Sequence, residues 1–174
     1  MQDTNTFSVR KAQHEDVTTI MEIIDLAKED MRASGNNQWQ NGTPNAGMLH
    51  ADIDRGVSYV LCDADGSIQG TAYISTEQDP TYKVIWDGTW RAADEPYTVI
   101  HRVAVRRSER GRGLALHIVN FAKTVAAADG THQLRIDTHE KNIPMQHFLA
   151  RNGFSRRGII QSGEGPRIAY DYFF

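Results

Sequence analysis

A loop rich in glycine and arginine joins a predicted strand to a predicted helix in the stretch Val103-Ala104-Val105-Arg106-Arg107-Ser108-Glu109-Arg110-Gly111-Arg112-Gly113-Leu114-Ala115. The first turn of a helix presents unpaired N–H groups and a partial positive charge, so an anion there gains hydrogen bonds and a favourable field. Gly111 and Gly113 keep side chains away from the backbone where a phosphate would approach. Four arginines in this loop, in a chain of net charge -3, can pair with phosphate oxygens. The stretch therefore predicts a local anion site.

Other phosphate-binding loops have different signatures. No Lys-Ser or Lys-Thr pair follows the glycines, which excludes a P-loop. The Gly-x-Gly-x-x-Gly fingerprint of dinucleotide-binding folds is absent too, and the preceding strand is not part of an early βαβ unit. A solvated basic turn before a surface helix is the alternative, and the strand and the amphipathic helix that flank the loop argue against it.

Hydrophobic periodicity extends this strand–loop–helix unit in both directions. It predicts helices over 15–33, 46–55, 113–128 and 144–151, and strands over 7–10, 57–62, 68–75, 97–105, 133–137, 154–160 and 168–173. Alternation along the strand 97–105 places on one face Val99, His101, Val103 and Val105. The order of elements indicates an α/β (α+β) fold with a mixed sheet that is not doubly wound. The length suits a single domain over 1–174.

Composition narrows the range of partners and of compartments. Hydrophobic residues make up 40% and charged residues 24%, and the net charge of -3 offers no attraction to nucleic acid or to an anionic membrane. Cys62 is the single cysteine, so an intrachain disulfide is excluded. The polar N-terminus, Met1 to Thr6, lacks a signal-peptide pattern, and no apolar run approaches the ~20 residues of a membrane span. We expect a cytoplasmic protein with no nucleic-acid or membrane partner.

Three features in order resemble a known superfamily. The pattern Arg110-x-x-Gly113-x-Ala115 resembles the Arg/Gln-x-x-Gly-x-Gly/Ala signature of the GNAT (Gcn5-related N-acetyltransferase) superfamily. The preceding strand, which ends in Val103-Ala104-Val105, is similar to the family strand at that place, and so is Asn142 with Gly153-Phe154 downstream of it. The resemblance covers most of the chain and is firm from residue 97 to 154. Together the three features are far more specific than any one alone.

The resemblance implies a fold, a cosubstrate and a reaction. The GNAT fold is a mostly antiparallel, splayed sheet of about seven strands flanked by about four helices. A V-shaped gap between the fourth and fifth strands admits the pantetheine arm of acetyl-CoA, beside Asn142 and the main chain of Val103, Ala104 and Val105. The pyrophosphate is expected on the amides of Arg110, Gly111, Arg112, Gly113, Leu114 and Ala115. An acceptor amine would attack the thioester directly, with no metal, and family analogy alone suggests a homodimer.

His101 is the first candidate for the base that deprotonates the amine. An alkylamine with a pKa of ~10 costs roughly 4 kcal/mol to deprotonate at pH 7. The run His101-x-x-Ala-Val resembles arylalkylamine N-acetyltransferases, a GNAT branch in which a histidine is assigned to proton removal. A core histidine bonded to a neighbour is the alternative interpretation, and Glu95 is the rival carboxylate. A main-chain N–H near Val103 is the expected donor to the oxyanion.

Candidates for the acceptor side of the site are Trp39, Tyr97, Asp137 and Glu140. Trp39 lies in a polar loop that roofs the acceptor site in this fold, although it could equally anchor the loop to the core. The carboxylates of Asp137 and Glu140 could act as the base or could instead attract a cationic substrate, and Tyr97 could line the opposite wall. Many relatives carry a tyrosine that protonates the leaving thiolate at the position of Leu149, where we expect a packing role instead.

The sequence thus predicts an N-acetyltransferase that moves an acetyl group from acetyl-CoA to a primary amine of a small molecule or peptide. Because Leu149 cannot donate a proton, a catalytically weak acyl-CoA-binding regulatory module is one alternative. A phosphate-binding module unrelated to coenzyme A is another.

Overall fold

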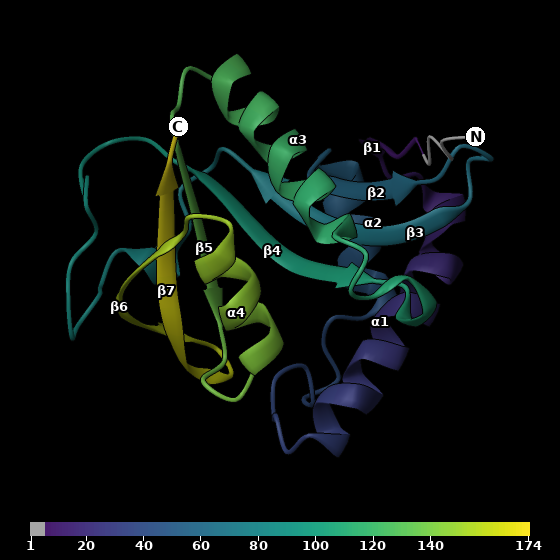
Figure 1. Ribbon diagram of the computed structural model, residues 1–174, viewed down its shortest axis with the longest axis horizontal. Helices are drawn as coiled ribbons and strands as arrows, with labels where there is room; N and C mark the ends of the chain where they lie inside the picture. Colours follow the sequence, from purple (N-terminus) through teal and green to yellow (C-terminus); the bar gives the residue numbers. More distant parts are fainter. Residues whose placement is uncertain (1–5) are drawn as a thin grey trace.

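One seven-stranded sheet organises residues 6–174, the part of the chain that the computed structural model describes. Its order is β1-β2-β3-β4-β5-β7-β6, and every neighbouring pair is antiparallel except β4 with β5 (Figure 1). The mixed sheet confirms the predicted fold class, while residues 1–5 of the polar N-terminus lie outside the described part. The strands are β1 Ser8–Lys11, β2 Ser58–Cys62, β3 Ile68–Ser75, β4 Thr98–Val105, β5 Gln133–Thr138, β6 Ser155–Ser162 and β7 Gly165–Phe173.

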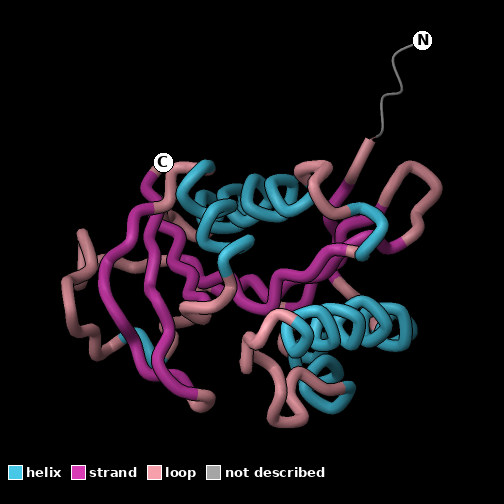
Figure 2. Tube along the Cα trace, turned by 60° about the horizontal axis from the view of Figure 1, so that its bottom comes forward, coloured by secondary structure: helices cyan, strands magenta, loops and turns pink. Residues whose placement is uncertain are grey.

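Four helices cover the two faces of this sheet, α1 and α2 on one and α3 and α4 on the other (Figure 2). Their bounds are α1 Val17–Ala33, α2 Ala46–Asp54, α3 Leu114–Ala128 and α4 Ile143–Arg151. The predicted helix 15–33 starts as a 3-10 turn, η1 His14–Asp16, before α1 proper. Among residues 6–174, no helix has both the length and the apolar character of a membrane span.

Each face has its own apolar core, because the helices bury residues at a spacing of three and four. In α1 the buried side chains are Val17, Ile20, Ile23, Ile24 and Ala27. On the other face the core is built by α3 and α4 together, and Leu149 of α4 is 0% exposed there. Leu149 therefore packs in the core, as predicted.

The strands β4 and β5 pair only where they begin. Thr98 lies opposite Leu134 and Val99 opposite Arg135, after which β4 continues with β3 and β5 with β7. Figure 1 shows the two strands diverging from that point. This V-shaped gap between the fourth and fifth strands is the one that the family resemblance implies.

A β-bulge in β4 corrects the predicted alternation along that strand. Tyr73 of β3 lies opposite His101, but Thr71 lies opposite Ala104, so β4 carries one extra residue between them. Arg102 takes up that residue with a φ of 53°. A bulge shifts the side-chain period by one, so the predicted face shared by His101 and Val103 is wrong: Val103 packs toward the core under α3.

The last two strands are longer than predicted, because they form a tight hairpin. Pairing between β6 and β7 continues as far as Ser162 opposite Gly165. The expected strands 154–160 and 168–173 thereby extend toward each other, and only Gly163 and Glu164 remain in the turn. This turn brings Glu164 back to the mouth of the gap between β4 and β5.

Truncation of Leu149 tests its role in packing. Leu149→Ala should lower the free energy of unfolding by about 2–5 kcal/mol, because it removes a fully buried side chain from a close-packed core. Urea unfolding measures this loss. Leu116→Ala, which truncates a leucine on α3 that is 36% exposed, is the matched control. A loss at Leu149 no larger than the loss at Leu116 would contradict the assignment.

Candidate active site

The glycine–arginine loop ends in an uncapped helix. Gly111 and Gly113 have φ values of 78° and 79°, and Gly113 is the N-cap residue of α3 in the left-handed conformation. Within the described residues, no side chain caps this helix. A Cβ atom at either glycine would meet nothing within 4 Å, so the backbone conformation and not lack of space requires glycine there. At the start of α3 the N–H of Leu116 donates to the main-chain oxygen of Gly113 at 3.0 Å, and the space beside Gly111 and Gly113 is open.

The arginines of this loop are tied to the protein itself. Arg107 donates to Asp30 at the end of α1 at 2.7 Å, and Arg110 also binds Asp30. Arg106 donates to the main-chain oxygen of Ile68 at 3.1 Å, and Arg112 pairs with Glu109. The sequence predicted these guanidiniums as phosphate ligands. In the structure Arg107 and Arg110 hold the loop against α1, whereas Arg106 binds the main chain of β3 and Arg112 pairs within the loop. The uncapped helix amides are the groups left for an anion.

Asn142 caps α4 and also reaches a second loop. Its side-chain oxygen accepts a hydrogen bond from the N–H of Met145 at 3.3 Å, and its amide donates to Gln38 at 3.3 Å. Gln38 belongs to the loop between α1 and α2. Asn142 thus joins the start of α4 to that loop at the edge of the gap between β4 and β5.

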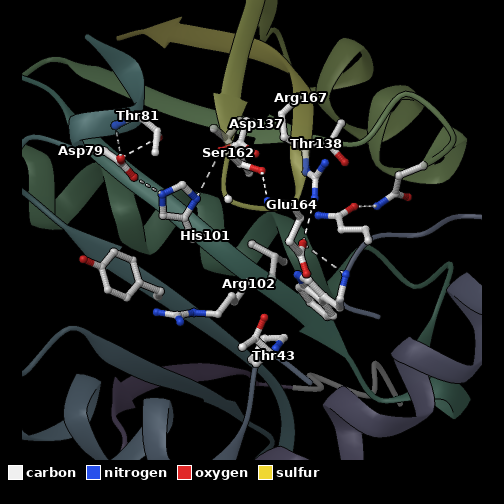
Figure 3. A pocket seen from close by; sticks show the side chains of 18 of the residues that line it. Thr43, Asp79, Thr81, His101, Arg102, Asp137, Thr138, Ser162, Glu164 and Arg167 are labelled. Carbon is white, nitrogen blue, oxygen red and sulfur yellow. Dashed lines mark hydrogen bonds and ion pairs between the residues drawn. The ribbon is translucent and has the colours of Figure 1, made fainter. Parts of the chain in front are cut away.

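A cavity of about 510 Å³ occupies this gap on the side of α1 and α2. Figure 3 shows the side chains that point into it. The strands β4 and β5, the loop between α1 and α2, the loop after β3 and the β6–β7 turn all contribute to its wall. Among the residues of this wall are Trp39, Asp52, Asp79, His101, Arg102, Val103, Asp137, Thr138, Asn142, Glu164 and Arg167.

His101 stands between two carboxylates. Its Nε2 is 2.7 Å from Oδ2 of Asp79, and its Nδ1 is 3.5 Å from Oδ2 of Asp137. Thr81 donates its main-chain N–H to Asp79 at 2.8 Å, which fixes that carboxylate at the N-cap of the 3-10 helix η2 Pro80–Tyr82. In the tautomer with the proton on Nε2, Asp79 orients the ring and Nδ1 carries the lone pair. This arrangement suits a general base.

The charge of Asp79 is stabilised by the same contacts. Burial favours its neutral form, but hydrogen bonds from His101 and Thr81 outweigh burial and lower the pKa of Asp79 to about 2. Sequence periodicity missed Asp79, because it lies in the long loop between β3 and β4. The signal that could have found it is Asp79-Pro80, since aspartate before proline is a common start of a helical turn.

Asp137 is held by a buried tyrosine. The hydroxyl of Tyr82 donates to Oδ2 of Asp137 at 2.7 Å. Burial, with the adjacent Asp137 charge, raises the pKa of Tyr82 well above its usual value, so this hydroxyl keeps its proton. The other oxygen of Asp137 can therefore accept a hydrogen bond from a molecule in the cavity.

The bulge of β4 carries a buried ion pair. Arg102 donates to Asp52 of α2 at 2.6 Å, and its guanidinium lies 4.8 Å from the centre of the Tyr73 ring. Burial raises the pKa of Asp52 and lowers the pKa of Arg102. The pair fixes Arg102 in its left-handed conformation, and Arg102 and Val103 have no partner in register among the described residues of β3.

Three predicted site residues lie elsewhere than expected. Glu95 is exposed before β4 begins, and Glu140 is exposed after β5 ends, so among the described residues neither belongs to the cavity wall. Tyr97 is buried behind the wall, where its hydroxyl accepts the N–H of Asp79 at 2.9 Å. The structure brings together His101, Val103, Asp137, Asn142 and Trp39. The structure therefore argues against Glu95 as the rival base. It also argues against Tyr97 and Glu140 as contacts of the acceptor.

Comparison with known proteins identifies the class. Residues 20–154 match the Acetyltransferase (GNAT) family. A GNAT-family acetyltransferase from Streptococcus agalactiae 2603 has a crystal structure that is similar with a TM-score of 0.88 and 30% identity, covering 97% of this chain and 95% of that one. YesJ of Bacillus subtilis (strain 168), an uncharacterized N-acetyltransferase, is 26% identical over an alignment of 163 residues that covers 87% of this chain and 83% of YesJ.

A more distant structure shares the fold in the presence of a ligand. The PaiA N-acetyltransferase from Thermoplasma acidophilum, in complex with coenzyme A, has a TM-score of 0.71 at 15% identity, covering 96% of this chain and 99% of that one. The fold and these matches make the protein an acyltransferase. More particularly, the chain belongs to the GNAT family of acetyltransferases.

The depressed pKa of Asp79 predicts a pH-dependent contribution to stability. The pKa falls from 3.8 to about 2 on folding, so the contribution is present above pH ~4 and is lost as the pH drops toward ~2. The free-energy difference between the wild type and Asp79→Asn should shrink by about 2 kcal/mol over that range. Urea unfolding at several pH values measures it. Asp65→Asn, an exposed loop carboxylate, is the control, and a constant difference at Asp79 would refute the coupling.

Proposed function

We propose that this enzyme transfers the acetyl group of acetyl-CoA to a primary amine of a small molecule or peptide. The observation that carries this proposal is a cavity in the gap between β4 and β5 with the pair His101 and Asp79 on its wall. The gap gives access to a thioester from one side of the sheet and to an amine from the other. A cytoplasmic protein with one catalytic domain over 1–174, acting as a homodimer, completes the proposal.

Coenzyme A fits the donor side of the gap. Its pyrophosphate suits the uncapped start of α3, where the space beside Gly111 and Gly113 is open. The main-chain amides from Arg110 through Leu114 to Ala115 would bind it. Beyond Val99 the edge of β4 is not paired with β5, so the main chain of Val103, Ala104 and Val105 is offered to the amides of the pantetheine arm. Asn142 lies at the edge of this channel. Acetyl-CoA is a cosubstrate in this scheme and supplies the acetyl group.

The residues on the acceptor side carry the proton chemistry. His101 takes a proton from the acceptor ammonium, and Asp79 stabilises the imidazolium that forms. The amine nitrogen then forms a bond to the thioester carbon, and the main-chain N–H of Val103, in the bulge, stabilises the oxyanion. The carbon–sulfur bond breaks as the carbonyl reforms, and the nitrogen, now part of the amide, releases its second proton to solvent. The thiolate takes its proton from solvent, since Leu149 fills the position of the family tyrosine.

The character of the cavity favours a small acceptor that binds as a cation. Its wall includes four carboxylates and three guanidiniums, namely Asp52, Asp79, Asp137, Glu164, Arg55, Arg102 and Arg167. An ammonium group is attracted to the excess negative charge, and the oxygen of Asp137 that is not bonded to Tyr82 can accept a hydrogen bond from it. Trp39, 8% exposed, closes the roof.

A substitution in the glycine loop tests the donor side. Gly113→Asp should weaken coenzyme A binding at least ~100-fold, because it puts a carboxylate at the helix start where the pyrophosphate would lie. Calorimetry measures the dissociation constant. Gly130→Asp is the matched control, since Gly130 lies at the other end of α3 with a φ of 75° and nothing within 4 Å of an added Cβ. If both substitutions changed the dissociation constant for coenzyme A equally, the glycine loop would not be part of the coenzyme site.

A substitution of the histidine tests the acceptor side. His101→Gln should lower kcat/KM about 100-fold or more near neutral pH without changing the affinity for coenzyme A. The deficit should shrink as the pH rises toward the pKa of the amine, where solvent removes the proton. A continuous thiol-release assay with a panel of primary amines measures both.

The control for this test is His132→Gln, an exposed histidine at the start of β5. An unchanged pH profile in His101→Gln would clear His101 of the role. Tight coenzyme A binding by the wild type without turnover of any amine would favour the regulatory-module alternative.

A further inference from the structure

Glu164 presents a buried oxygen that the protein does not use. It lies in the β6–β7 turn, where its Oε2 accepts hydrogen bonds from Arg167 at 2.8 Å and from the main-chain N–H of Trp39 at 3.4 Å. Its Oε1 is buried and has no hydrogen-bond partner among residues 6–174. The hydroxyl of Thr138, at the end of β5, is buried without a described partner in the same way. Both residues belong to the wall of the active-site cavity.

An unsatisfied buried carboxylate oxygen indicates a missing donor. A buried polar atom without a hydrogen bond costs about 1–3 kcal/mol, and more when it is charged. Native proteins keep few such atoms, so each calls for an explanation. An ionised carboxylate can only accept hydrogen bonds, which means that the group completing Glu164 must donate one. A charged donor such as an ammonium makes a hydrogen bond to a carboxylate that is roughly twice as strong as one from a neutral donor.

The surroundings of Glu164 also favour a cation. Trp39 lines the cavity and also packs in the core beside α1 and α2, and an indole face attracts ammonium groups. Trp39 has a φ of 63°, and its main-chain N–H donates to Oε2 of Glu164. Arg167 is already engaged with that oxygen and is 3% exposed, so it leaves Oε1 to a ligand.

The cavity therefore has two separate acidic positions. Figure 3 shows Asp79 and His101 on one side of the view and Glu164 with Arg167 on the other, with Asp137 between them. We infer that the acceptor is a diamine or polyamine: one amine reacts beside His101 while a second, charged ammonium is bound by Glu164, Thr138 and Trp39. This inference rests on the proposed function and names its substrate class.

Matched amines test this inference. Putrescine, cadaverine and spermidine are compared with n-butylamine and n-pentylamine in the thiol-release assay. The wild type should show a kcat/KM at least ~10-fold higher for the best diamine or polyamine than for the monoamines, in line with one charged hydrogen bond. Glu164→Gln keeps the shape but removes the charge, and it should lower kcat/KM about 10-fold more for that amine than for monoamines, mainly through KM.

Two further variants keep the result interpretable. Thr138→Val should reduce the same preference, because it removes the second unpartnered group, and it provides the test if Glu164→Gln does not fold. Asp87→Asn breaks an exposed ion pair with Arg156 outside the cavity, so it should leave all rates and the preference unchanged. Equal use of monoamines and diamines by the wild type, or an equal loss for both in Glu164→Gln, would overturn the inference.

Failure of the proposed function gives a different result. If thiol release occurs with no amine, the transferase proposal fails, and calorimetry of putrescine against the protein saturated with coenzyme A then tests the subsite alone. Binding that weakens about 10-fold or more in Glu164→Gln, and not in Asp87→Asn, would support a diamine site. If putrescine did not bind, the proposed diamine site would be excluded.

Discussion

The early end of hydrogen bonding between β4 and β5 is the constraint on which the rest of the structure depends. Two paired positions, at Thr98 and Val99, hold the two halves of the sheet together before the strands diverge. Unpaired backbone groups inside a protein need partners, so a gap of this kind favours a ligand that brings its own amides. The same divergence leaves room for the cavity between the two strands, next to α1 and α2.

The wall of the cavity depends on departures from regular structure. The bulge at Arg102 separates His101 from Val103, so that the histidine faces α1 and α2 while Val103 packs toward α3. A regular strand would put both side chains on one face. Asp79 and Glu164 come from a loop and a turn, and they add the orienting carboxylate and the unused acceptor atom. The cavity wall is thus built by irregular segments on a regular frame.

Sequence reasoning was most successful where the signal was periodic or local. The helices, the strands in chain order and the glycine loop followed from hydrophobic spacing and from Arg110 to Ala115, and Leu149 was rightly placed in the core. The bulge could not be predicted, because arginine carries no signal for a left-handed backbone. Asp79 was missed, and Glu95 was named as the carboxylate rival of His101, because pairing across a long loop depends on tertiary contacts that one sequence does not reveal.

The central claim is that the gap between β4 and β5 holds the acetyl donor. A crystal structure of the protein with coenzyme A tests it most directly. The account predicts the pyrophosphate on the main-chain amides from Arg110 to Ala115, the pantetheine arm along β4 beside Val103, and the sulfur in the gap on the side of His101. Coenzyme A bound away from the gap, or a gap filled by protein side chains in the crystal, would contradict it.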